Sequence, residues 1–506
     1  VSLTPIFSAR SRSSAACGNR RPCIWPPMHL SAAALLMMAV AASSATQATA
    51  QSLTERFTAH TAGATATVDH SAWDRLLKAH VVASPDGVNR VAYARFKKAG
   101  HAELKAYLGR LQAAAQDFAP DRDPNAAVSV LERPRPEYDP LGKRLGGFDL
   151  NASVALNVAS TDNVFAEETS TDEDIIGSIA PNVSLASHWS RHSLSVGAGG
   201  YSNSHQDFGG NDITDAYLRA DGRVDIYRSS EVGAGASVNQ THELRSDPDS
   251  PNSVAEPVEY KRNNAHLYAR HAFNRVRLTG RVERNTYDYD DTPLNGGSTL
   301  DQDFRDHDET VGSLRAEVAV SPRLALVGEV AANEREYDTA LRDSDGRHFA
   351  AGVSFDFTQL ARGELLVTQY NQDYADPAIG AVDGTGFHGR VEWYPSQLTT
   401  VNLDASKSVE DSAVFGASYV LTQAGARVDH EVLRNLIVSG GVRVQSREYE
   451  GIARSDDRMA ADIGATYLAN RRVRINVGFA HDENDSNFAG EDFEENRLSA
   501  GVSFHL

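Results

Sequence analysis

The chain has 506 residues, a net charge of −19 at neutral pH and a mean hydropathy of −0.40. It shows no stripe of Lys and Arg to neutralise phosphates, so we expect no nucleic-acid partner. After Ala50 no apolar run approaches the roughly 20 residues of a membrane-spanning helix. A membrane role would therefore have to come from β-strands, whose lumen-facing half keeps the mean hydropathy low.

Residues 1–50 are interpreted as an over-long start followed by a signal peptide. The stretch from Met28 to Ala50 has an apolar core and ends in Ala48-Thr49-Ala50, which is an A-x-A cleavage pattern. We expect Met28 to be the initiator and Gln51 the first residue of the exported chain. The apolar core is too short for a membrane anchor. The only cysteines, Cys17 and Cys23, lie before this core and follow no lipobox, so we expect neither lipidation nor a cysteine-based metal site.

Residues 51–119 are predicted to form a small helical region on the periplasmic side. Ser71 is a candidate N-cap for a helix with Trp73, Leu76 and Leu77 on one side. A turn is expected at Pro85-Asp86-Gly87, followed by a second helix. The apolar stripe of that helix would consist of Leu104, Tyr107, Leu108 and Leu111.

The same region resembles the opening of the DUF547 family. The resemblance is carried by Asp69-His-Ser-x-Trp73-Asp74 and by Val91-x-Tyr93, and it covers residues 69–118. The rest of that domain is missing, so no site is carried over. His70 and Asp74 are interpreted as capping or surface residues.

Residues 120–147 are predicted to be a periplasmic linker. The stretch from Pro120 to Gly142 is rich in Pro, Asp and Arg. Because proline lacks an amide hydrogen and fixes its own backbone angle, such a density is incompatible with helix or sheet interior.

Residues 148–506 are dominated by segments in which apolar and polar residues alternate. In the last segment Leu498, Ala500, Val502, Phe504 and Leu506 fall on one face, and small or polar residues fall on the other. An aromatic residue two places before an apolar terminus resembles the C-terminal assembly signal of outer-membrane barrels. Val502, Phe504 and Leu506 are therefore predicted to be a barrel-assembly signal.

The connections between these segments alternate in length. Short ones, such as 189–192, 273–275, 321–323 and 469–472, rotate with long acidic ones, such as 245–261 and 288–306. Short turns on one side and long loops on the other are typical of bacterial outer-membrane barrels. Nothing in a soluble β-sandwich requires short and long connections to alternate so regularly. We predict an all-β fold, a transmembrane antiparallel up-and-down β-barrel of about 18 strands.

The alternation also assigns the two faces of the wall. Apolar residues such as Leu278, Leu326 and Phe349 should face lipid, and Trp189, Tyr227, Trp393, Tyr394 and Tyr467 lie near segment ends, where aromatic girdles are found. Charged residues on the other face should line a pore and select polar solutes. The alternative is that the arginines only brace the wall through neighbouring carboxylates. The predicted pore-lining residues are Arg219, Arg223, Arg270, Arg277, Arg281, Arg315, Glu317, Arg390, Glu392 and Arg443.

Four short motifs together resemble the putative β-barrel porin 2 family. They are Arg135-Pro-Glu-Tyr-Asp-Pro-Leu-Gly142, Thr161-Asp-Asn-Val-Phe165, Trp189-Ser-Arg-His192 and Asn333-Glu-Arg-Glu-Tyr337, and the resemblance extends over roughly 135–506. The family consists of outer-membrane proteins often associated with capsule or exopolysaccharide production. The resemblance implies a barrel and a link to glycans.

Neither the acidic loops nor a search for catalytic motifs indicates a further site. The stretches 287–291 and 301–309 hold many carboxylates but lack the spacing of an EF-hand, so we expect solvated loops, with ions bridging to lipopolysaccharide as the alternative. No G-x-S-x-G elbow, H-E-x-x-H helix or P-loop occurs. Ser503 and His505 share a face, although residues two apart on a strand seldom form a catalytic pair. No catalytic residue, metal site or cofactor is predicted.

The leading functional hypothesis is a passive pore or export conduit for a hydrophilic polymer such as exopolysaccharide, because rings of this size can leave an aqueous channel. The alternatives are a structural or adhesive barrel that acts through its outer loops and an outer-membrane hydrolase. The expected location is the cell outer membrane, with the N-terminal region in the periplasm. The expected partners are outer-membrane lipid, lipopolysaccharide and the barrel-assembly machinery, with polysaccharide as cargo.

Overall fold

The computed structural model describes residues 71–82, 90–91, 103–105, 128–169, 171–227, 229–250, 253–357, 360–377, 379–412 and 418–506. The predicted signal peptide, residues 51–70 and the expected turn at residues 85–87 lie outside these ranges. Among the described residues no helix has the length and apolarity to cross a membrane.

The short N-terminal part is described by itself. Helix α3 spans Ser71–His80 and begins where the sequence predicts, and β1 (Val81–Val82) pairs with β2 (Arg90–Val91). Leu76 is buried, whereas Trp73 on the same predicted stripe is exposed. Of the second predicted helix, only residues 103–105 are described, and they are helical.

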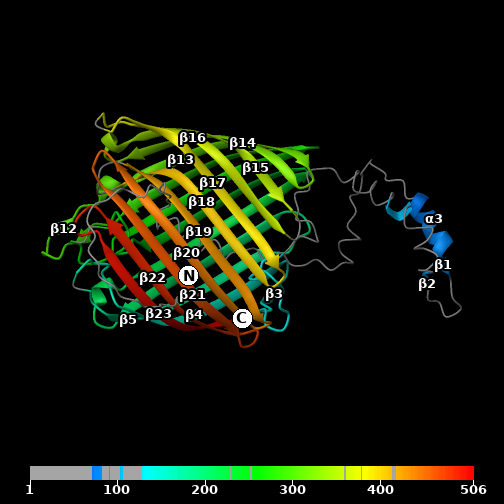
Figure 1. The fold of residues 1–506 in the computed structure, drawn as a ribbon, viewed down its shortest axis with the longest axis horizontal. Helices are drawn as coiled ribbons and strands as arrows, with labels where there is room; N and C mark the ends of the chain where they lie inside the picture. The colour runs from blue at the N-terminus through cyan, green and yellow to red at the C-terminus, as the bar shows by residue number, and fades with distance from the viewer. Residues whose placement is uncertain are drawn as a thin grey trace, which may run out of the picture. The chain divides into compact units, whose positions relative to one another are not determined.

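The rest of the described chain forms a closed barrel of 18 antiparallel strands (Figure 1), which confirms the predicted fold class. Short elements lie outside the ring or at its seam: β3 (Lys143–Leu145), β11 (Thr292–Pro293), β12 (Thr299–Leu300), η1 (Gly209–Asn211), η2 (Asp303–Arg305) and η3 (Ala340–Arg342). The ring strands are β4 (Phe148–Thr161), β5 (Asp174–Ser187), β6 (Ser193–His205), β7 (Thr214–Tyr227), β8 (Ser230–His242), β9 (Glu259–Phe273), β10 (Val276–Tyr289), β13 (His307–Ser321), β14 (Leu324–Tyr337), β15 (Ser344–Asp356), β16 (Ala361–Tyr374), β17 (Ala381–Ser396), β18 (Thr399–Asp411), β19 (Ser418–Leu433), β20 (Leu436–Glu450), β21 (Ser455–Leu468), β22 (Val473–Ser486) and β23 (Phe493–His505).

The ring closes where the last strand pairs with the first. β23 pairs with β4 from Arg497↔Thr161 to His505↔Ser153, so the predicted assembly residues Val502 and Phe504 lie in the seam itself. β4 extends beyond this pairing, and β3 covers its remaining edge through Lys143↔Leu150. This leaves neither side of the seam unpaired, as a hydrocarbon environment requires.

Gly142 makes the junction before β3 possible. Its amide donates to the Leu506 carbonyl oxygen at 3.3 Å, and its φ is +62°. A Cβ there would lie 2.7 Å from the Leu150 carbonyl oxygen, so a side chain would be both strained and obstructed. The end of the expected linker is therefore part of the barrel seam.

The two faces of the wall differ as the alternation predicts. Aliphatic and aromatic side chains such as Phe349, Val367 and Leu498 stand on the outer face, each with 60% of its surface exposed. Of the expected girdle residues, Trp189, Tyr227, Trp393 and Tyr467 are exposed. Tyr394 is not, because it follows Trp393 on β17 and therefore points inward, where it is buried with Arg362 over its ring.

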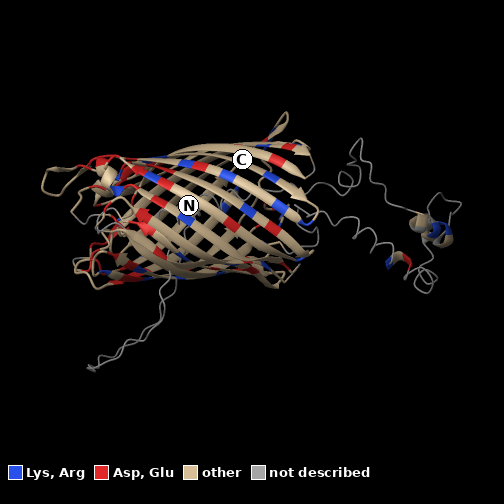
Figure 2. Ribbon diagram, turned by 90° about the horizontal axis from the view of Figure 1, so that it is seen from above, with Lys and Arg blue, Asp and Glu red and all other residues tan. Residues whose placement is uncertain are grey.

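Short turns join the strands at one end of the barrel, and longer loops that carry η1, η2 and η3 join them at the other. We call these the short-turn end and the long-loop end. Figure 2 shows Asp and Glu gathered at the long-loop end, while both signs of charge are interspersed along the wall. The acidic excess of the chain is thus concentrated around one opening.

The barrel lumen as the candidate functional site

The predicted pore-lining residues occupy the inward face of the ring. Arg219 and Arg223 lie on β7, Arg270 on β9, Arg277 and Arg281 on β10, Arg315 and Glu317 on β13, Arg390 and Glu392 on β17, and Arg443 on β20. Each alternates with outward apolar neighbours such as Leu218, Leu278 or Leu314. That they line a conducting pore stays a prediction.

Many of these arginines are braced by carboxylates on the wall. Arg315 donates to Glu317 on its own strand and to Glu329 on β14, both at 3.2 Å, and also to Glu364 on β16. Since β14 and β15 lie between β13 and β16, the guanidinium reaches past two strands through the interior. Similar pairs join Arg270 to Glu231 at 2.8 Å, Arg281 to Glu283 at 2.7 Å, Arg443 to Asp404 at 3.5 Å and Glu392 to Arg362.

Arg390 differs from these braced arginines. Its side chain is exposed toward the lumen and makes no hydrogen bond or ion pair with any residue in the described part of the chain. An arginine that forms no ion pair can hold a passing anion, and this role of Arg390 stays a prediction.

The loop between β8 and β9 folds across the lumen at the long-loop end. We call residues 243–258 the mouth loop; residues 251 and 252 lie outside the described ranges. β8 and β9 lie about half way round the ring from β21, yet Arg458 on β21 donates to Ser246 at its carbonyl oxygen (2.9 Å) and at its Oγ (3.0 Å). The mouth loop therefore spans the opening from wall to wall.

Close to β8 and β9, the strands that it connects, the mouth loop is anchored by buried contacts. Glu243 accepts hydrogen bonds from Arg305 of η2, and both side chains are buried. Burial raises the pKa of the Glu243 carboxyl to about 8, although the adjacent Arg305 opposes this rise. Arg245 donates to Asn211 Oδ1 at 2.7 Å, and Val254 and Val258 are almost fully buried.

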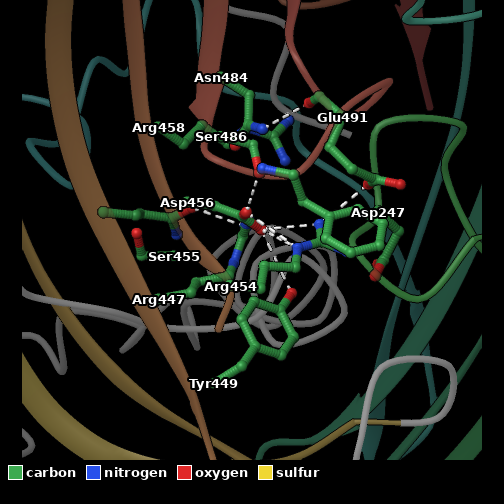
Figure 3. Close-up of polar contacts among 12 residues, drawn as sticks. Asp247, Arg447, Tyr449, Arg454, Ser455, Asp456, Arg458, Asn484, Ser486 and Glu491 are labelled. Atoms are coloured by element: carbon green, nitrogen blue, oxygen red, sulfur yellow. Dashed lines mark hydrogen bonds and ion pairs between the residues drawn. The ribbon is translucent and has the colours of Figure 1, made fainter. Parts of the chain in front are cut away.

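Where the mouth loop reaches the opposite wall, Asp247 lies beside a buried polar cluster on β20, β21 and the loops next to them (Figure 3). Arg454 donates to Asp456 at 2.8 Å and to Glu491 at 2.9 Å. Burial raises the pKa of Asp247, while the charges of Arg447 and Arg458 oppose that shift. Ionisation of Asp247 is thus linked to how closely the mouth loop packs against this wall.

Neither the position of the mouth loop nor the polar cluster beside it was predicted. The stretch 245–261 was expected to be an outer loop, and its mouth-loop residues instead lie across the opening. Arg447 was also not predicted, although a signal existed: it lies four residues after the predicted Arg443 on the inward face of β20.

At the short-turn end, residues 128–139 pack into the opening; we call them the inner segment. Val130 and Arg135 are buried. The Val130 amide donates to Thr400 Oγ1 at 2.9 Å, and Arg135 donates to Glu431 at 2.7 Å and to the Val130 carbonyl oxygen at 2.8 Å. These residues, which the sequence analysis places in a linker, are thus attached to the inward faces of β18 and β19.

A third link crosses the interior between β14 and β18. Arg335 donates to Asp411 at 2.7 Å, and the hydroxyls of Tyr337 and Tyr374 donate to the same carboxylate at 2.9 and 2.7 Å. Three strands lie between β14 and β18, so these bonds form a chord of the ring. The His307 ring stacks on the Tyr337 ring, with 4.4 Å between the two ring centroids.

Three of the four family motifs coincide with contacts that close the lumen. Arg335 and Tyr337 come from the motif at 333–337, and Arg135 opens the motif at 135–142. In the motif at 161–165, the Asn163 side chain donates to the Glu494 carbonyl oxygen at 3.0 Å, and Arg245 of the mouth loop lies over the Phe165 ring at 5.7 Å. The motifs therefore mark what occupies the barrel interior.

Two smaller groups of polar residues lie in stretches that the sequence had already singled out, one on β23 and one in the loop before β13. Ser503 Oγ and His505 Nε2 are within hydrogen-bonding distance, at 3.1 Å, and the expectation that two residues so placed on a strand seldom form a catalytic pair stays a prediction. No carboxylate of the described residues hydrogen-bonds the other ring nitrogen, so the pair lacks the third group of a catalytic triad. At the long-loop end Asp291, Asp301 and Asp303 gather on the surface, and the charge of Asp301 raises the pKa of Asp303.

A closed ring with an apolar outer face, a charged inner face and long loops at one end defines a porin-like outer-membrane β-barrel. The chain matches the family described as Putative beta-barrel porin 2 over residues 135–506 and belongs to this family. No curated protein matches the chain.

Solved structures with a similar course of the chain are outer-membrane proteins. OpdK of Pseudomonas aeruginosa is 13% identical, with 71% of this chain and 99% of that chain covered and a TM-score of 0.40. OccK2 (OpdF) of the same organism, in complex with glucuronate, is 14% identical, with 71% and 98% covered and a TM-score of 0.42. A BenF-like porin from Pseudomonas fluorescens Pf-5 is 11% identical, with 71% and 99% covered and a TM-score of 0.39.

Proposed function

We propose that this barrel is a passive diffusion channel for hydrophilic solutes, narrowed at both openings by its own chain. The observation that carries the proposal is the mouth loop, which reaches from β8 to Arg458 on the opposite wall. Between this loop and the inner segment lies a wall of arginines and carboxylates that favours water and polar solutes over lipid. The short-turn end, with the inner segment, faces the periplasm, and the long acidic loops face outward.

The channel passes small solutes more readily than a polymer. A polysaccharide chain is continuous, so it must keep both openings clear throughout its passage. The mouth loop, the inner segment and the Arg335–Asp411 chord all lie in its way. Export of a hydrophilic polymer such as exopolysaccharide, which the family resemblance implies, is therefore the alternative and requires the mouth loop to swing aside.

Two measurements separate these functions. Purified protein in a planar bilayer should give small, discrete conductance steps, and a variant with residues 246–256 replaced by a short Gly-Ser turn should give larger ones. Proteoliposomes should admit monosaccharides faster than oligosaccharides. Absence of any conductance in both proteins would contradict the channel, and rapid passage of long oligosaccharides through the intact protein would favour the polymer conduit.

The remaining alternatives have their own tests. An adhesive role would depend on exposed loops, yet most described residues of the mouth loop, one of the long candidates, are buried or half-buried within the opening. Cell adhesion that falls when residues 288–306 are shortened, with conductance unchanged, would support that role. A hydrolase using Ser503 and His505 would release product from lipid or glycan substrates in detergent, and S503A would abolish the release.

A further inference from the structure

The outer face of the barrel carries an apolar depression that the channel function does not use. It has a volume of about 650 Å³ and extends over strands β8 to β15. Gly280, Gly312 and Ala332 form its floor, and Leu267, Leu314 and Phe349 rise beside them. These three large residues are more than half exposed, which places the depression, here called the outer groove, on the lipid-facing side of the wall.

The two floor glycines are not demanded by the fold. Neither has a φ in the left-handed region, and a Cβ built on either one meets no atom within 4 Å. A glycine inside a strand costs stability relative to a residue with a side chain, because the unfolded chain is freer and no contact is gained. Its presence within a strand often marks a place where a ligand approaches the backbone closely. At Gly280 and Gly312 the absence of a side chain leaves open space on the outer face of the barrel.

Arg347 lies at the end of the outer groove that is nearer the long loops. Its register partner on β14 is Ala332 of the groove floor, and Phe349 of the groove wall is two residues further along β15. The Arg347 side chain is exposed and makes no hydrogen bond or ion pair within the described ranges. Glu334 and Asp345, which pair with each other in the register, lie next to it on the same face.

We propose that the outer groove binds one acyl chain of a phosphorylated glycolipid of the outer leaflet, with Arg347 against its phosphate. The apolar floor matches a hydrocarbon chain, and a cation at the level of the long loops matches an anionic headgroup above it. Glu334 and Asp345 supply carboxylates through which a divalent cation bridges to the same phosphate. This inference rests on the proposed orientation, in which the long loops face outward.

The test measures how many lipid molecules stay bound to the purified barrel. Wild-type protein is exposed in detergent to purified lipid A, washed and analysed by native mass spectrometry. Substituting both Gly280 and Gly312 by Leu fills the groove without touching the backbone, so retention should fall more than about tenfold, as expected from the lost burial of two or more methylene groups. Arg347→Gln should lower retention about fivefold, the effect of one cation near an anionic lipid surface.

Matched controls keep the proposal falsifiable. Gly177 on β5 also has open space at its Cβ and lies between the exposed Ile175 and Ile179, so Gly177→Leu should leave retention unchanged. Lipid A stripped of its phosphates should bind the wild type and Arg347→Gln equally, and EDTA should weaken only the phosphorylated form. Equal retention by wild type and the filled-groove variant would overturn the proposal. A change of oligomeric state in that variant, with lipid retention intact, would also overturn it in favour of a second copy of the chain.

Channel conductance distinguishes failure of this inference from failure of the proposed function. The outer groove faces away from the lumen, so the filled-groove variant should conduct like the wild type. Loss of lipid with normal conductance supports both ideas. Normal lipid retention with normal conductance removes only the lipid site.

Discussion

Replacing Arg135 by alanine should release the inner segment from the short-turn opening. The Arg135 guanidinium and the Glu431 carboxylate are both almost fully buried and lie 2.7 Å apart. Removing one partner of a buried ion pair costs about 3–5 kcal/mol, because the other charge is left uncompensated. Arg133 stays 3.4 Å from Glu431 and compensates in part. We therefore expect the lower value, about 3 kcal/mol, which shifts the balance between docked and released segment more than about a hundredfold.

Single-channel recording measures this release. Arg135→Ala should show a higher mean conductance or frequent transitions to a larger level that the wild type rarely visits. Arg191→Ala is the matched control, because this exposed arginine lies in a turn at the same end and, within the described ranges, its side chain donates only to the Asp225 and Ile226 carbonyl oxygens. Exchanging the charges in a double variant, R135E with E431R, should restore the small level. If Arg135→Ala conducts like the wild type while it still migrates as a folded barrel, the inner segment does not narrow the channel.

Three further predictions concern the mouth loop and the lumen wall. Arg458→Ala removes both hydrogen bonds to Ser246 and should raise conductance, since their loss costs about 2–3 kcal/mol; unchanged current would show that the loop is held elsewhere. Burial raises the pKa of Glu243 from 4.5 to about 8 in the docked loop, so docking is strongest below pH 4.5 and weakens as the pH rises toward 8. Conductance should therefore increase across that window in the wild type and increase less in Glu243→Gln, in which the raised pKa of Asp247 still links docking of the mouth loop to pH. Arg390→Glu should shift the reversal potential in a salt gradient toward cation selectivity, whereas the outer-face variant Arg284→Glu should not.

The ring itself was predictable because its signals are local. A strand that separates lipid from water must alternate along its own sequence, as Leu498 to Leu506 do, and hairpin neighbours pair in chain order. Even the seam was signalled by the apolar positions Val502 and Phe504. Tyr394 shows the limit of this reasoning. Its aromatic character suggested a girdle position, but the side-chain period of two, set by its neighbour Trp393, turns it inward.

What fills the ring was not predictable from the same signals. Arg335 and Asp411 are 76 residues apart and on strands that do not pair, so no local pattern connects them. The mouth loop is acidic and polar, as exposed loops are, and its attachment to Arg458 depends on which strands stand opposite each other in the closed ring. Proline-rich composition excluded helix and sheet interior for residues 128–139, but it did not reveal that Val130 and Arg135 would be buried. Such contacts depend on the curvature of the whole barrel.

The sharpest test of this account compares adjacent positions on one strand. Leu218 and Arg219 on β7 should face opposite media, and a single cysteine placed at either position would be free of interference, because Cys17 and Cys23 precede the predicted start of the exported chain. In intact proteoliposomes the cysteine at 219 should react with a small water-soluble maleimide, and the cysteine at 218 should react only with a lipid-soluble one. Reaction of both positions with the water-soluble reagent would contradict a ring that separates a wet lumen from the surrounding lipid.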